Sequence, residues 1–240
     1  LAANGGQVAV AQGMAQDGPG FKGQLSIDVG VTTGNTEMVQ SKAAAVASYD
    51  HGPHTMLGSL TAAYAESKRT AVGEQVIFHT HYRYRLFEHL AAEVYANYAY
   101  DKFAGFDVQL ATGPDLVLLF QVDALRIDIG FGYMLQYEDY GEITGPTAGQ
   151  SVTAHRAQLY VFAEYDLAPN LQFIEHALYM PRLDGAGPKD YMFISASSLS
   201  IQFNPVLSFQ NTFNLAYDVP APLNTKRLNT QLLVGLALNF

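Results

Sequence analysis

The sequence predicts an all-β fold: a closed antiparallel transmembrane β-barrel of the outer-membrane type, with roughly twelve strands. Three features of the 240-residue chain favour this fold. Long segments alternate between apolar and polar residues, which is typical of strands whose two faces meet different surroundings. Short and long connections alternate along the chain. No continuous apolar run reaches the length of about 18 residues that a membrane-spanning helix requires.

Twelve segments carry the period-two pattern. All reach or exceed the roughly 9–11 residues that a tilted strand needs to cross the hydrocarbon layer, whereas strands of soluble sheets usually have about five or six. Strand length therefore favours a membrane barrel over a β-sandwich. The predicted strands are residues 22–33, 39–50, 55–66, 73–86, 91–101, 106–119, 123–138, 153–166, 171–182, 190–203, 206–218 and 227–240.

The last strand alternates up to the final residue, with Leu233 as the one large apolar side chain on its polar face. It ends on Phe240, preceded by Gly235 and Leu238. This ending resembles the assembly signal by which bacterial outer-membrane barrels are recognised for insertion. We therefore expect the outer-membrane barrel assembly machinery to be a transient partner.

The connections fall into two alternating kinds. Tight turns are predicted at residues 51–54, 87–90, 120–122, 167–170 and 204–205. Longer or more polar links are predicted at residues 34–37, 67–70, 139–152, 183–189 and 219–226, and the short link at 102–105 departs slightly from the pattern. Short turns on one side and longer loops on the other are the asymmetry of outer-membrane barrels. An even strand number then places both termini on the periplasmic side.

Composition agrees with a barrel that spans a lipid bilayer. Hydrophobic residues make up 49% of the chain, yet the mean hydropathy is +0.03, because a barrel presents its lipid-facing residues one at a time. The 15 Tyr and 14 Phe would supply aromatic girdles at the two membrane interfaces. The net charge of −9 argues against a nucleic-acid partner.

Residues 1–20 differ from the rest of the chain. They are rich in Ala, Gly and Gln and lack the basic and apolar regions of a signal peptide. We expect a mature chain whose signal peptide has been removed, with residues 1–20 as a flexible tail and 21–240 as the barrel. A short plug or a periplasmic docking strand is the alternative role for the tail.

The segment Gly30–Glu37 resembles the "SGNTE" hairpin of the domain of unknown function 481 family, whose members are often labelled salt-induced, YdiY-like outer-membrane proteins. Further similar segments are Asp101–Asp107, Asn170–Phe173, Tyr179–Pro181 and the final Phe240. The resemblance covers residues 21–240 and implies a single monomeric barrel without an established reaction. Gly113-Pro114 departs from the family pattern, and since proline cannot donate to a strand ladder, a bulge is expected there.

Alternation also predicts which side chains face the lumen. In the hairpin of the fourth and fifth strands, Glu93 should lie opposite Arg83 or Arg85. The predicted lumen lining is His79, His81, Arg83, Arg85, Glu93, Asp128, Arg156 and Glu164. Because unpaired burial of these charges would be costly, they should pair across a narrow lumen. The pattern favours a salt-bridged interior that stiffens the barrel, and the alternative is a small pore lined by arginines and opposing carboxylates.

No pattern in the chain indicates catalysis or a cofactor. His79 and His81 share one strand face and could reach one ion, but there is no cysteine, and Glu93 or Tyr95 would have to complete the site. Paired histidines in a polar lumen are more often simple lining, so no metal site is assigned. None of the seven histidines is followed two residues later by serine, as in a phospholipase barrel. We therefore expect a protein that is not an enzyme.

Two functional classes remain open. The first is a structural or scaffolding barrel of the bacterial outer membrane, surrounded by its lipid and able to join envelope protein partners in a larger assembly. The alternative is a narrow, weakly selective pore for ions or small polar solutes. Large inward side chains such as Tyr95, Tyr160, Phe162 and Arg156 favour closure, whereas inward Gly130, Gly132 and Gly235 favour open space.

Overall fold

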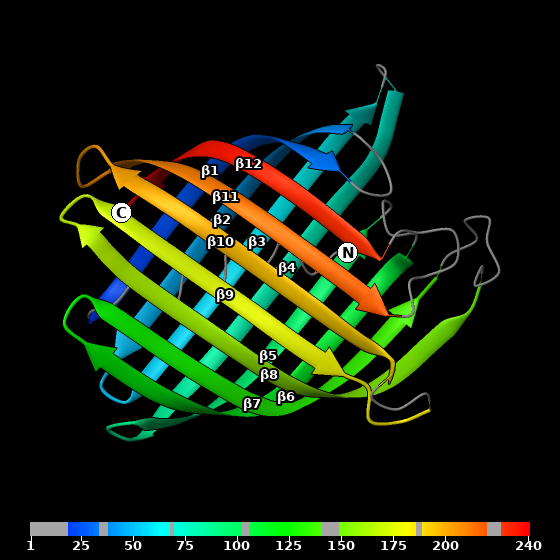
Figure 1. The fold of residues 1–240 in the computed structure, drawn as a ribbon, viewed down its shortest axis with the longest axis horizontal. Coiled ribbons are helices and arrows are strands. Elements are labelled where there is room, and N and C mark those ends of the chain that lie inside the picture. Colours follow the sequence, from blue (N-terminus) through cyan, green and yellow to red (C-terminus); the bar gives the residue numbers. More distant parts are fainter. Residues whose placement is uncertain are drawn as a thin grey trace.

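A computed structural model of the protein describes residues 19–33, 38–67, 70–101, 106–140, 149–185, 189–219 and 227–240. Its strands form one closed barrel in which each strand pairs antiparallel with the next and the first pairs with the last (Figure 1). The predicted all-β barrel of twelve strands is confirmed. Among the described residues there is no helix long and apolar enough to cross a membrane.

The strand bounds agree with the predicted ranges to within a few residues. The strands are β1 (Gly20–Thr33), β2 (Met38–His51), β3 (His54–Ser67), β4 (Thr70–Phe87), β5 (Leu90–Asp101), β6 (Phe106–Val122), β7 (Leu125–Asp139), β8 (Ser151–Ala168), β9 (Leu171–Pro181), β10 (Tyr191–Gln202), β11 (Leu207–Val219) and β12 (Leu228–Asn239). The predicted tail, residues 1–20, lies outside the described residues except at its last two positions. The link at 102–105 also lies outside them.

The turn between β6 and β7 differs from its predicted place at residues 120–122. β6 continues to Val122, which pairs with Leu125, and the turn consists of Asp123 and Ala124. Asp123 has a φ of 52°, in the left-handed region that Asp tolerates better than most residues. The apolar residues before it, Phe120 among them, favour a strand and therefore extend β6.

The bulge expected at Gly113-Pro114 is absent. Thr112 pairs with Leu135 and Asp115 with Gly132, so the β6–β7 register is the same on both sides of the proline. At Gly113 and Pro114 the β6–β7 ladder instead lacks two consecutive residue pairs. A Cβ on Gly113 would collide with the carbonyl oxygen of Tyr133, so glycine lets the two backbones approach where proline cannot bond.

The barrel closes along the seam between β1 and β12, where the register runs from Gln24–Asn239 to Thr33–Thr230. Phe240 extends the seam by two backbone hydrogen bonds with Gly23, of 2.8 and 3.0 Å. Leu233, the apolar residue on the polar face of β12, lies opposite Gly30. A side chain at Gly30 would meet Leu233, so glycine makes room for it inside the barrel.

The outer wall is mainly apolar between two bands of aromatic residues. Exposed aromatic side chains near the short turns, here called the turn-side girdle, are Phe21, Tyr49, Tyr84, Phe87, Phe120, Tyr165, Phe203 and Phe240. The loop-side girdle contains Tyr64, Tyr98, Tyr179, Tyr191 and Tyr217. Between them lie exposed aliphatic residues such as Ile27, 70% exposed, and Val234. This arrangement is that of a wall in contact with lipid.

The inside of the barrel has two unlike halves. One half contains a buried apolar cluster that draws on β5–β10 and, from β3, Leu57. The other half is formed by β1, β2, β11 and β12, and its buried side chains are mostly small or neutral and polar: Gln24, Ser26, Gln40, Ser48, Ser208, Gln210, Thr212, Asn214 and Asn229. Asp28 and Lys42 lie opposite each other in this half. The interior is therefore only partly the polar lumen that alternation predicts.

Candidate functional site: the charged interior

A network of charged side chains crosses the interior from β4 to β8. Arg83 on β4 bonds through Nε to Glu93 on β5, and its Nη1 donates to Asp128 Oδ2 on β7 at 2.8 Å. Arg126 donates to the same Asp128 oxygen at 2.9 Å. Tyr160 on β8 donates to Glu93 at 2.8 Å. With Glu164, 3.9 Å from Arg126, these residues form the central network.

The structure does not bring all the predicted lumen residues together. His81, Arg83, Glu93 and Asp128 are buried together in the central network, and His81 Nε2 lies 3.5 Å from Glu93. Arg83 lies opposite Glu93, one of the two predicted pairings. Arg85 is exposed at the turn end of β4, one residue beyond the last pair of β3 and β4, His54–Tyr84.

A small cavity of about 80 Å³ lies on the loop side of the central network. Its lining includes His79, His81 and His176 beside apolar side chains. The rings of His79 and His81 are 6.3 Å apart. Within the described ranges, no group of three His, Asp or Glu side chains has a geometry that would hold a metal ion.

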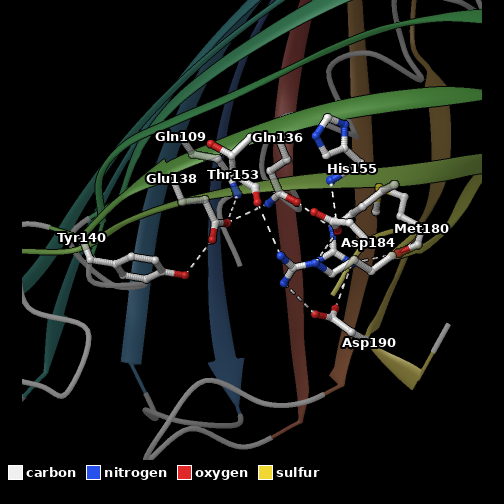
Figure 2. A network of polar contacts seen from close by, with 11 residues as sticks. Gln109, Gln136, Glu138, Tyr140, Thr153, His155, Met180, Asp184 and Asp190 are labelled. Carbon is white, nitrogen blue, oxygen red and sulfur yellow. Dashed lines mark hydrogen bonds and ion pairs between the residues drawn. The ribbon is translucent and has the colours of Figure 1, made fainter. Parts of the chain in front are cut away.

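A second polar group, the loop-side network, surrounds Arg156. Figure 2 shows Gln136, Glu138 and Asp190 of this network. Arg156 donates to Gln136 at 2.8 Å, to the Met180 carbonyl oxygen at 3.1 Å and to Asp190 at 3.0 Å. Glu138 accepts bonds from Gln109, Gln136 and Tyr140. Arg156, which was predicted to line the lumen, therefore lies far from Arg83 along the barrel and belongs to a different network.

Arg182 extends the loop-side network towards the loop that follows β9. It donates to Asp184 at 2.7 Å and to Asp190 at 3.3 Å. The hydrogen bond from Arg182 holds the pKa of Asp184 below its usual value. The loop after β9 is thus bonded to the rim of the barrel by charged groups.

The mouth at the short turns is open. A vestibule of about 730 Å³ is lined there by polar side chains such as Gln24, Ser200 and Gln210 and by the turn residues 123–124 and 169–170. The central network separates the vestibule from the small cavity. Arg126 and Glu164 line the vestibule, whereas Glu93 and Tyr160 line the small cavity.

The inward glycines do not leave open space. A Cβ on Gly130 would collide with the ring of Tyr160, and one on Gly132 or Gly235 would meet Asp115 or Asp28. Each glycine gives room to a neighbouring side chain that reaches across the interior. The sequence left open whether the large inward side chains or the inward glycines determine the interior. The structure shows that the large side chains fill the middle of the barrel.

One charged residue lies where the sequence did not lead us to expect it. Glu175 on β9 faces outward, since its neighbours Ile174 and His176 are buried inside. Apolar residues occur on both faces of β9, so alternation alone does not tell its inner face from its outer face. The serines of β10 could have indicated partners for this carboxylate, but only the β9–β10 register shows that they lie beside it.

A closed antiparallel barrel with an apolar outer wall, two aromatic girdles and a charged interior is a transmembrane β-barrel of the outer-membrane type. The chain belongs to the family described as protein of unknown function, DUF481, whose model matches residues 26–240. The family resemblance predicted from the sequence is confirmed. No curated protein matches the chain in sequence.

Solved outer-membrane barrels share the fold. The NanC porin matches with a TM-score of 0.59 and 9% identity, over 89% of this chain and 98% of that one. The translocator domain of autotransporter NalP from Neisseria meningitidis has a TM-score of 0.55 and 15% identity, over 97% and 93%. The COG4313 outer membrane channel from Pseudomonas putida F1 has a TM-score of 0.54 and 13% identity, over 94% and 97%. At these identities the likeness concerns the fold alone.

Proposed function

We propose that this chain is a structural barrel of the bacterial outer membrane, closed by its own side chains, that anchors an envelope assembly. The observation that carries the proposal is the central network, in which Arg83 joins Glu93 and Asp128 from two other strands and Tyr160 bonds to Glu93. Buried, mutually bonded side chains of this kind stiffen the interior and leave little room for a solute. The outer wall and the fold of the similar solved barrels support the location.

The proposed role is not enzymatic. In the part of the chain that the structure describes, the buried carboxylates Glu93 and Asp128 are bonded to arginines and have no substrate-sized space beside them. The protein then acts through its loops, its termini and its outer wall. We place the short turns and both termini in the periplasm, as the alternation of short and long connections favours, with barrel assembly machinery as a transient partner.

A narrow pore is the second candidate. The vestibule and the small, polar side chains of β1, β2, β11 and β12 favour it, and two of the similar barrels are described as a porin and a channel. In such a pore Arg83 and Arg156 would influence ion preference, because charged side chains control selectivity.

Single-channel recording in planar bilayers separates the two candidates. We expect no conductance steps from the wild-type protein. The double variant Arg83→Ala/Tyr160→Ala, which removes two side chains that cross the interior, should conduct and serves as the positive control for insertion. Wild-type conductance steps with a reproducible ion preference would contradict the structural role and establish the pore.

A further inference from the structure

Glu175 places a carboxylate on the outer wall of the barrel. Ser195 Oγ on β10 donates to Glu175 Oε1 at 2.7 Å, and Ser197 Oγ donates to Oε2. All three side chains are partly exposed on the lipid-facing side. Two hydroxyl groups therefore fix the orientation of the carboxylate without supplying a positive charge.

The depth of Glu175 in the bilayer follows from its neighbours. Phe173, two residues nearer the short turns, pairs with Tyr165 of the turn-side girdle, and Tyr179 of the loop-side girdle is four residues the other way. Two residues span about 7 Å along a strand, which a tilt of about 40° reduces to roughly 5 Å of depth. Glu175 thus lies just inside the hydrocarbon layer, below the level of the lipid headgroups.

The charge has no cationic partner on the wall. In the described strands, no lysine or arginine faces outward between the two girdles. The other outward carboxylates among these residues, Glu74 and Asp139, lie at the loop ends of β4 and β7. A carboxylate within the span is unfavourable for the barrel alone and usually marks a functional contact.

Small side chains surround the carboxylate. Ala163 lies directly opposite Glu175 on β8, and Ala177 lies beside Ser195. With the two serines, they make up a patch of small side chains around Glu175, here called the Glu175 patch. Small residues in a membrane-facing surface let a bound group approach the backbone closely.

We propose that the Glu175 patch binds the primary ammonium group of a phospholipid headgroup of the ethanolamine type, in the leaflet on the short-turn side. A headgroup needs to descend only about 5 Å from the girdle level to reach the carboxylate. A primary ammonium brings both the positive charge and hydrogen-bond donors, whereas a choline headgroup has no N–H to donate. A second copy of the chain does not match the charge, since its described strands present no lysine or arginine on the wall between the girdles.

Native mass spectrometry of the purified barrel with equal amounts of ethanolamine and choline phospholipid tests the proposal. The wild type should retain the ethanolamine lipid about tenfold better, the ratio expected from one charge-assisted hydrogen bond. Glu175→Gln should abolish the preference. Asn211→Leu, which removes a polar side chain from the same outer wall but keeps the carboxylate, should preserve it.

Successive N-methylation of the lipid provides a test on the wild type alone, should Glu175→Gln fail to fold. Retention should fall with each methyl group. Equal retention of the two lipids by the wild type would overturn the proposal, as would a preference that survives in folded Glu175→Gln. Pairing with a lysine-bearing membrane peptide, or Glu175-dependent dimers, without any lipid preference would also overturn it. The result does not depend on whether the lumen conducts.

Discussion

Replacing Arg83 with glutamine should destabilise the barrel more than any other single loss of charge in the central network. The side chains of its two partners are almost fully buried, with 2% of Glu93 and 1% of Asp128 exposed. Removing one member of such a buried pair usually costs about 3–5 kcal/mol, because the remaining charge is left uncompensated. Arg126 still bonds to Asp128 and Tyr160 to Glu93, so the expected loss is near 3 kcal/mol.

The measurement is the free energy of unfolding from urea titrations in lipid vesicles. Since the chain contains no tryptophan, the folded fraction is best followed by far-ultraviolet circular dichroism. Arg85→Gln is the matched control, because Arg85 is exposed and its loss should change the free energy by less than about 0.5 kcal/mol. Adding Glu93→Gln to Arg83→Gln should recover part of the loss. Equal unfolding midpoints for the two single variants would refute a stabilising role of the network.

Three further variants test other parts of the structure. Gly130→Ala should displace the tyrosine ring that covers it and cost about 1–3 kcal/mol in the same titration, whereas Gly58→Ala, with no atom near its Cβ, should be neutral; similar costs would argue against the packing described. Phe240→Asp should lower the yield of heat-resistant, folded barrel in assembly assays more than Asn239→Asp, and equal yields would argue against a role of the terminal aromatic residue. Ile27→Arg, between the girdles, should cost about 2–4 kcal/mol, and Phe21→Arg, at the girdle, about 1 kcal/mol or less; the reverse order would misplace the membrane.

The fold could be predicted because its determinants are local. Period-two alternation reveals the strands, and consecutive antiparallel pairing follows from the tight turns. The same locality places Glu93 opposite Arg83, two residues joined by a short hairpin. The turn after β6 was misplaced because Phe120 and Val122 favour a strand, while Asp123-Ala124 lacks the usual glycine of a two-residue turn.

The interior was harder to predict because its contacts cross the barrel. The bond from Arg83 to Asp128 joins β4 to β7, and no hairpin or alternation rule relates those strands. The apolar half was missed because β9 carries apolar residues on both faces, Ile174 and Leu178 inside and Phe173 and Tyr179 outside. The same ambiguity concealed Glu175. Only the register with β8 and β10 decides which of these faces meets lipid.

The unequal halves of the interior have a consequence for the order in which the barrel is built. The apolar cluster draws almost entirely on β5–β10, which are neighbours in sequence. The side chains of this cluster can therefore pack together before the two ends of the chain meet. β1 and β12 contribute mainly small or polar inward side chains. While these two strands are still unpaired, little apolar surface of the interior is therefore exposed to water. We therefore expect the two end strands to be the last to join and the first to part under denaturant.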